Sequence, residues 1–340
     1  MKVEKGLVSV IMSNFNTPEE YLRNAIESIL TQTYNNIEFI IVDDYSNNNS
    51  LSVIESYDDS RIVLIKNEQN MGITKSLNRA LVVAKGEFVA RMDADDICLP
   101  ERLEKQIDFL RQNPDVFVCG TGVELFGDGA DAYNEKVVCK TIPEKEKFQI
   151  LLLFGNHTNI IHPTAMFRHQ VLIDNKLSYN EKYMFAQDYR MWVSCSRIGE
   201  CANVPDVLFK YRIHKKAVSS SNKNTQSDCA RDIIVEQLSW LDLKLPEDWE
   251  EIHYGYFVGR KKYNLKQKKW IKKIIRQNKR KKIYNQKMLK KMLYEKWAET
   301  VYFELFNVPI IKKFFVLFSL PVKYWKNLIF IRKKRAVKEK

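Results

Sequence analysis

The sequence predicts an α/β fold, in which a mostly parallel β-sheet is flanked by helices and followed by a basic helical extension. Short apolar, β-branched runs alternate with helical patterns through the first part of the chain, which is typical of such a sheet. The charge is divided unevenly, because residues 241–340 contain 28 Lys and Arg against 9 Asp and Glu, whereas residues 1–240 contain 27 against 33. The acidic body and the basic extension therefore need separate interpretations.

The strands and helices of the body are predicted from hydrophobic periodicity. Leu7–Ser13 is suited to a strand that is buried on both faces, and similar runs predict strands at 37–44, 61–67, 87–92 and 115–122. Apolar residues at helical spacing predict helices at 18–32, within 47–57, at 72–84 and at 100–113. Thr17 is the expected N-cap of the first helix, with Pro18 in its first turn.

Composition narrows the class of protein. A chain of 340 residues with 45% hydrophobic content can bury a large core. The six cysteines form no CxxC pair and no zinc-binding spacing, which favours unpaired thiols in a reducing compartment. No run reaches the roughly 18 apolar residues of a membrane-spanning helix, and the N-terminal run is too short and interrupted for a signal peptide. We expect a cytoplasmic protein.

Polar and acidic residues follow three of the predicted strands. They are Ser13 to Asn16, Asp43 with Asp44, and Asp93 to Asp96. In parallel sheets, ligands bind beyond the carboxyl ends of the strands. Turn formation and helix capping alone could explain the last two groups. Three acids in four positions exceed what capping needs, so we favour a hard cation such as Mg²⁺ or Mn²⁺ and a phosphate-bearing ligand.

Four stretches of this sequence resemble the family 2 glycosyltransferases in order and spacing. They are "VSVIMSNFN", "IEFIIVDDYSNNNS", "NMGITKSLNRALVVAKGEFVARMDADDICLPERL" and "FAQDYRMWV", within residues 6–215. The resemblance implies the GT-A fold, a Rossmann-like mostly parallel sheet, and an inverting enzyme that uses a nucleoside-diphosphate sugar. It does not extend to the basic C-terminal part.

The resemblance also implies which residues bind the nucleotide sugar. Ser13 would contact the nucleotide, and Asp44 would accept a hydrogen bond from the base, typically uracil. Asn78 occupies the family's helix position that faces the nucleotide, although a packing or solvated role is an equally good interpretation of this side chain.

The acids of "DADD" would hold the metal. By resemblance, Asp95 is the direct ligand of Mn²⁺ or Mg²⁺, and Asp93 lies near the ribose or the metal-bound phosphate. Asp96 is left as a helix cap or a supporting residue. His214 resembles a late family histidine near the metal or pyrophosphate, but a lone loop histidine is as often incidental.

The catalytic base is expected downstream, in "AQDYRMW". The family usually has Glu-Asp here, whereas this chain has Gln187 followed by Asp188. In an inverting displacement one carboxylate suffices, because it takes the acceptor's proton while the metal neutralises the leaving diphosphate. Asp188 is therefore the predicted base, with a helix N-cap as the alternative. His162, Gln187 and Trp192 are expected in the acceptor region.

The basic extension interleaves cations with apolar residues. Its apolar residues approximate a helical stripe, which is typical of a helix at a membrane surface: Trp270, Ile271, Ile274, Ile275, Ile283, Met288, Leu289, Met292, Leu293 and Trp297. Residues 309–335 alternate apolar patches with lysines and aromatics in a similar way. A nucleic-acid-binding segment, or a packed helical face with solvated lysines, are the alternatives.

These observations lead to an overall prediction. Residues 1–215 form the catalytic domain, 216–255 a helical connection, and 256–340 a basic tail on an anionic membrane surface. The enzyme would be a hexosyl- or N-acetylhexosaminyltransferase that extends a lipid-linked or oligosaccharide acceptor for a capsule, O-antigen or lipooligosaccharide, with no nucleic acid expected. Its rivals are a metal-dependent phosphate hydrolase with an aspartate nucleophile and a nucleic-acid-binding protein with a non-catalytic body.

Overall fold

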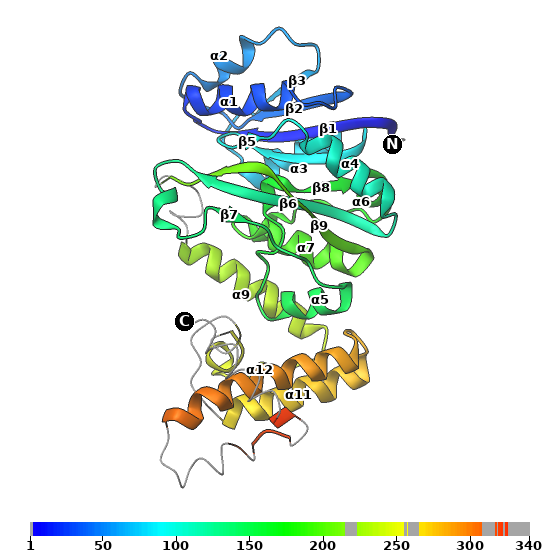
Figure 1. Cartoon of the computed structure of the whole chain (residues 1–340), viewed down its shortest axis with the longest axis vertical. Helices are drawn as coiled ribbons and strands as arrows, with labels where there is room; N and C mark the ends of the chain where they lie inside the picture. Colours follow the sequence, from blue (N-terminus) through cyan, green and yellow to red (C-terminus); the bar gives the residue numbers. More distant parts are fainter. Residues whose placement is uncertain are drawn as a thin grey trace. The chain divides into compact units, whose positions relative to one another are not determined.

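The computed structural model describes residues 3–214, 223–254, 257, 265–307, 317, 319–321 and 324–325 (Figure 1). By its internal packing the chain divides into two units. The first contains residues 1–145 and 157–230, and the second contains residues 146–156 and 231–340. The first unit contains most of the predicted catalytic domain, and residues 146–156 from within that domain pack with the second unit. The predicted functional boundaries at 215 and 255 stay predictions.

The first unit is built on one mixed sheet. Within the described residues it contains nine strands, ordered β3-β2-β1-β4-β8-β6-β9-β5, with β7 paired to β6. The strands are β1 (Glu4–Asn14), β2 (Ile37–Asp43), β3 (Ile62–Lys66), β4 (Gly86–Asp93), β5 (Ile97–Cys98), β6 (Val116–Phe126), β7 (Val137–Val138), β8 (Met166–Arg168) and β9 (Glu200–Arg212). The half formed by β3, β2, β1 and β4 is entirely parallel, as predicted.

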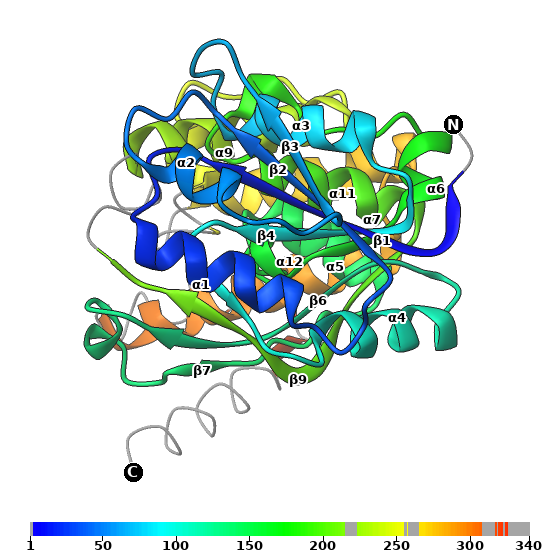
Figure 2. The same cartoon turned by 90° about the horizontal axis from the view of Figure 1, so that it is seen from above.

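Helices cover both faces of this sheet. They are α1 (Glu19–Leu30), α2 (Ser50–Glu55), α3 (Ile73–Val83), α4 (Arg102–Gln112), α6 (His169–Asp174) and α7 (Gln187–Ile198). Figure 2 shows α1 and α4 on one side of the sheet and α3 and α6 on the other. Apolar residues of α1, α2 and α4 share a core with alternate residues of β1, such as Val8, Val10 and Met12. This alternation follows from the two-residue period of a strand.

Two features of the sheet and one helix cap differ from the predictions or were absent from them. The strand that follows α4, β6, does not extend the parallel half, because β8 pairs antiparallel with both β4 and β6. The long strand β9, which carries Arg212, runs parallel to β6 and was not predicted. The N-cap position of α1 is Pro18 and not Thr17, and no side chain caps this helix end.

The second unit is helical in its described part. It contains most of α5 (Lys145–Leu153), the second half of α9 (Lys223–Ser239), a π-helical turn (Glu250–Tyr254), α11 (Leu265–Lys281) and α12 (Gln286–Asn307). Helices α11 and α12 pack against each other as a hairpin. Asn278 closes the hairpin, because its side chain donates to the Tyr284 carbonyl at 2.9 Å and accepts from the Tyr284 amide at 2.8 Å.

The packing of this hairpin corrects the prediction of an apolar stripe at a membrane surface. Trp270, Ile274, Leu289, Leu293 and Trp297 are all between 0 and 4% exposed. Their apolar surface is removed from water, whereas Ile275, Ile283 and Met288 are partly exposed and most lysines of the two helices are exposed. Residues 265–307 therefore form the packed helical face with solvated lysines that was the alternative interpretation.

No helix within the described part of the chain is long and apolar enough to cross a bilayer. The second amphipathic stretch, 309–335, lies almost entirely outside the described residues.

Candidate active site

The parallel half of the sheet brings the predicted nucleotide-binding residues to one edge. Ser13 in β1 is the register partner of Asp93 in β4, and the adjacent Asn14 is the partner of Asp43 in β2. Asp44 follows β2 directly. The sequence prediction of a polar edge beyond β1, β2 and β4 is therefore confirmed by the strand register.

Asp44 is buried and fully engaged with the loop that precedes α3. It is 2% exposed, and its carboxylate accepts hydrogen bonds from Asn67 Nδ2 at 2.6 Å and from the amides of Met71 and Gly72, both at 2.8 Å. Each contact fixes the loop between β3 and α3. Asp44 thus shapes the edge of the sheet, and its contact with a base stays a prediction.

Asp93, Asp95 and Asp96, which we call the acid cluster, lie close enough to share one ion. Ligand atoms from the three carboxylates lie within 4.8 Å of one another. Oxygen donors at this spacing match the preference of Mg²⁺ and Mn²⁺. The residues present therefore fit a hard divalent cation, as the D-x-D spacing predicts.

Arg212 at the end of β9 and His214 just after it contact the acid cluster. His214 Nε2 lies 2.8 Å from Asp95 Oδ2, so the late histidine does reach the predicted metal ligand. The Arg212 amide donates to Asp96 Oδ1 at 2.7 Å, and Arg212 Nε donates to the Asp95 carbonyl at 2.7 Å. Asp96, only 1% exposed, thereby ties the acid cluster to β9, which agrees with a supporting role.

Burial makes the charged forms of these acids costly. It raises the pKa of Asp93, and the charge of Asp95 adds to the rise while the cation of Arg91 opposes it. Burial, together with the neighbouring Asp93 and Asp95, raises the pKa of Asp96 well above its usual range. Carboxylates that resist ionisation in this way are stabilised by any cation among them.

One pocket joins the acid cluster to the predicted base. It has a volume of about 340 Å³, and Asp188, Gln187 and His162 line it together with the three acids. Its apolar lining consists of Ile73, Ile160, Ile161, Pro163, Met184 and Phe185. The charge of Asp188 also contributes to the raised pKa of Asp93, after burial and the nearer charges, so the two carboxylates are electrostatic neighbours.

Asp188 lies in the first turn of α7 but does not cap it. The N-cap position is Ala186, and Asp188 Oδ1 accepts from the Tyr189 amide at 2.7 Å. An acid in the first turn is stabilised by the positive end of the helix dipole. Gln187 is 9% exposed, and its Oε1 has no hydrogen-bond partner among the described residues. A buried acceptor of this kind, lining a pocket, is available to a ligand hydroxyl.

His162 and Trp192, the other two residues predicted for the acceptor region, differ in whether they line the pocket. His162 lines the pocket, and its Nε2 lies 2.9 Å from the Tyr179 hydroxyl. Burial, with a smaller contribution from the Arg91 cation, lowers the pKa of His162 well below its usual value, so the ring is neutral. Trp192 is 0% exposed and stacks on Phe167. Its indole thus packs edge-on against the ring of His162, and its place in the acceptor region stays a prediction.

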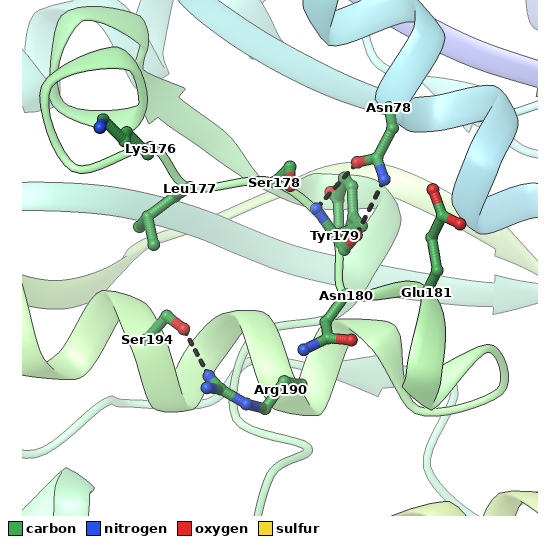
Figure 3. Close-up of a pocket in the computed structure, with 9 residues that line it drawn as sticks. All are labelled: Asn78, Lys176, Leu177, Ser178, Tyr179, Asn180, Glu181, Arg190 and Ser194. Atoms are coloured by element: carbon green, nitrogen blue, oxygen red, sulfur yellow. Dashed lines mark hydrogen bonds between the residues drawn. The ribbon is translucent and has the colours of Figure 1, made fainter.

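Asn78 does not reach the acid cluster. Its side-chain amide donates to the Tyr179 carbonyl and accepts from the Tyr179 amide, both at 2.8 Å (Figure 3). These two bonds join α3 to the segment before α7. They border a second, polar pocket of about 390 Å³, which also contains Lys176, Glu181 and Arg190. Asn78 thus holds the segment that leads to Asp188, which is the packing role left open as the alternative.

Several residues of the site were missed in the sequence. Arg91 lines the pocket, and Tyr179 is buried against His162. An arginine inside the apolar run of β4 was a readable signal for the first, whereas nothing in the local pattern marks Tyr179. Phe15 and Tyr45, which follow β1 and β2, are 48% and 58% exposed and do not line this pocket. Tyr45 also has a φ of 64°, which is uncommon for a bulky residue.

Known proteins resemble this chain in sequence. Residues 9–175 match the family described as "Glycosyl transferase family 2". An uncharacterized glycosyltransferase of Methanocaldococcus jannaschii is 38% identical over 217 residues, which cover 62% of this chain and 72% of that protein. A UDP-Glc:alpha-D-GlcNAc-diphosphoundecaprenol beta-1,3-glucosyltransferase of Escherichia coli is 31% identical over 221 residues, 63% of this chain and 80% of that protein.

Solved structures resemble it in fold. S. aureus TarS 1–349 in complex with UDP-GlcNAc has a TM-score of 0.57 at 20% identity, covering 90% of this chain and 87% of that chain. A mannosyltransferase from Pyrobaculum calidifontis, in complex with GDP-Man and Mn²⁺, has a TM-score of 0.52 at 18% identity, covering 74% and 70%. These likenesses establish the α/β GT-A fold. Together with the sequence relatives, they show that the chain belongs to glycosyltransferase family 2.

Proposed function

We propose that this glycosyltransferase moves a sugar, with inversion, from a nucleoside-diphosphate donor to a hydroxyl of a lipid-linked surface glycan. UDP-sugars are the donors we favour, with a hexose or an N-acetylhexosamine transferred. One observation carries the proposal: the acid cluster and Asp188 line the same pocket. A donor bound at the cluster and an acceptor hydroxyl at Asp188 would then meet in one cavity.

The donor side of the proposal rests on the acid cluster. Asp95, Asp93 and His214 would hold Mn²⁺ or Mg²⁺, which on binding neutralises the charge of the donor diphosphate. Ser13 lies next to Asp93 in the sheet register, where the nucleotide would reach it. Arg212 also lines the pocket, and its guanidinium, which lies over the rings of Tyr21 and Phe126, would add positive charge near a bound diphosphate.

The acceptor side rests on Asp188 and its surroundings. Asp188 would accept the proton of the attacking hydroxyl, and its neighbour Gln187 would accept a hydrogen bond from another acceptor hydroxyl through its unpartnered Oε1. The six apolar lining residues suit the apolar face of a sugar ring or a lipid. The Escherichia coli relative takes a diphosphoundecaprenol-linked sugar, according to its name, which supports an acceptor of the same class here.

The decisive variant is Asp188→Asn. Removing a general base lowers the rate by on the order of 100- to 10,000-fold. The donor is first identified by screening nucleotide sugars for thermal stabilisation of the protein in Mn²⁺. With that donor, we expect Asp188→Asn to lower the rate of sugar transfer by this factor. Donor binding should remain, because Asp188 does not hold the donor.

The matched control is Glu181→Gln, which neutralises an acid before α7 that does not line this pocket. Inversion is checked by the anomeric configuration of the product. Transfer at near wild-type rate by Asp188→Asn would contradict the assignment of the base.

We also propose that the cations of the second unit bind an anionic membrane surface at the inner face of the cell membrane. Lys269, Lys272, Arg276 and Lys279 are exposed along α11 and are called here the lysine face. Because the apolar stripe is buried inside the unit, the attraction would be electrostatic, at about 1 kcal/mol for each cation.

The test is co-sedimentation of the full chain with phosphatidylglycerol vesicles and with neutral phosphatidylcholine vesicles. We expect salt-sensitive binding to the anionic vesicles alone, and its loss when the four cations of the lysine face are changed to glutamine. Tighter binding to RNA than to anionic vesicles would favour the nucleic-acid alternative.

A further inference from the structure

The buried cation of Arg91 is paired with one acid of the cluster, Asp93. Arg91 is in β4, two residues before Asp93, so both side chains project from the same face of the strand. The side chain of Arg91 is 2% exposed, and one Nη atom forms an ion pair with Asp93 Oδ2. Arg91 is thus one of the largest fully buried side chains in the described part of the chain.

The other contacts of Arg91 show that its backbone, and not its guanidinium, holds the strand in place. Its amide donates to the Ala165 carbonyl at 2.8 Å, and its carbonyl accepts from Arg102 Nη2 at 2.9 Å. In contrast, Nε of Arg91 has no hydrogen-bond partner among the described residues, and Nη1 has only its ion pair with Asp93. A guanidinium buried with so few hydrogen bonds is stabilised mainly by nearby negative charge.

That negative charge comes from the acid cluster. The three carboxylates lie within 4.8 Å of one another, and Asp93 and Asp96 both act electrostatically on Arg91. Ionised carboxylates at this distance repel strongly in a buried site, so a cation beside them favours their charged forms over protonated ones even before any ligand binds. Arg91 is the buried cation that the fold places against Asp93.

We infer that Arg91 is a positioning residue, an internal counter-cation that keeps the acid cluster ordered while no divalent ion is bound. The inference rests on the metal site proposed above. With Arg91 in place, the carboxylates would already be held together for a divalent ion, whose charge would add to that of the guanidinium. Arg91 acts through Asp93 in this account.

The test compares the melting temperature in EDTA and in Mn²⁺. In EDTA, Arg91→Met should lower the melting temperature by on the order of 10 °C, because it leaves buried carboxylates uncompensated. Mn²⁺ should raise the melting temperature of this variant by more than it raises that of the wild type. Arg91→Lys keeps the positive charge, so its melting temperature in EDTA should fall by less than that of Arg91→Met.

A double variant separates charge from packing. In EDTA, Arg91→Met with Asp93→Asn should melt at a higher temperature than Arg91→Met alone, since removing one acid relieves the repulsion. The matched control is Arg61→Met, which removes an arginine that is paired with Asp59 at 2.8 Å away from the site. It should leave the gain from Mn²⁺ at the wild-type value.

Several outcomes would overturn the inference. They are a wild-type melting temperature for Arg91→Met in EDTA, a gain from Mn²⁺ no larger than that of the wild type, and no recovery in the double variant. If Arg91→Met is unfolded in EDTA, folding of the double variant supports charge compensation, and its failure to fold assigns Arg91 to packing. If the wild type gains nothing from Mn²⁺, the proposed metal site fails, while the comparison in EDTA still decides the role of Arg91.

Discussion

Two segments of this chain concentrate charge of one sign, and the structure treats them in opposite ways. The acid cluster is partly or fully buried at the edge of a sheet, where Arg91, Arg212 and His214 contact it. The lysine face is exposed along α11, over an apolar interior that contains Ile274 and Leu293. Buried charge is costly and needs specific partners, whereas exposed charge costs little. The first arrangement therefore indicates a binding site, and the second a surface.

The largest effect is expected where charge is buried. Asp95→Ala should weaken Mn²⁺-dependent binding of UDP by on the order of 1,000-fold, because losing only a partner that orients a metal ligand already costs about 10- to 100-fold. Calorimetry with Mn²⁺ and with EDTA measures this loss. Asp174→Ala, an exposed acid in α6, is the control. Unchanged Mn²⁺-dependent affinity in Asp95→Ala would remove Asp95 from the metal site.

The next effect concerns the apolar interior beneath the lysine face. Leu293 in α12 is 0% exposed, and truncating a fully buried leucine costs about 2–5 kcal/mol of unfolding free energy. We expect Leu293→Ala to lose roughly 3–4 kcal/mol in urea denaturation. Met288→Ala removes a less buried residue of the same helix and should lose less. Equal losses would mean that the stripe is not packed as the structure describes.

A buried neutral histidine gives the second unit a dependence on pH. Trp270 Nε1 donates to His253 Nδ1 at 3.0 Å, and His253 Nε2 contacts the Leu153 carbonyl at 3.1 Å. Burial lowers the pKa of His253 to about 4, although its bond to the Leu153 carbonyl opposes this change. The ring must therefore be neutral, with Nδ1 as the acceptor.

The sign of the effect follows from this lowered pKa. Between about pH 6.5 and pH 4 the unfolded chain binds a proton at His253 that the folded chain does not, so stability falls as the pH falls, by about 3 kcal/mol in total. The variant His253→Gln has no imidazole at this position, so its unfolded chain does not take up this proton. The stability difference between the wild type and His253→Gln should therefore shrink from pH 7 to pH 4 in urea titrations, and a constant difference would contradict the assignment.

The smallest effect is expected for the lysine face. Exposed substitutions away from packed features change stability by about 0.5 kcal/mol or less. Changing Lys272 alone to glutamine should therefore leave the urea midpoint almost unchanged, while the fourfold variant loses its binding to anionic vesicles. A loss of stability comparable with that of Leu293→Ala would mean that these cations are part of the packing.

Much of the fold could be predicted from local pattern, because burial imposes a period on each strand and helix. The four parallel strands and the edge that contains Ser13, Asp44 and Asp93 follow from such periods and from the position of polar residues after each strand. The short strand β8, which separates β4 from β6, was missed, since three residues carry no readable period.

The sequence by itself determined the chemistry of the site: three carboxylates at D-x-D spacing, a single acid after Gln187, and a strongly basic extension. Only the tertiary structure decided which charges compensate one another and which side chains are accessible. Arg91 and Tyr179 joined the site, Asn78 and Trp192 were assigned to packing, and the apolar stripe of α11 and α12 turned inward. The physical reason is that compensation and burial depend on contacts between residues far apart in the chain, which no local period encodes.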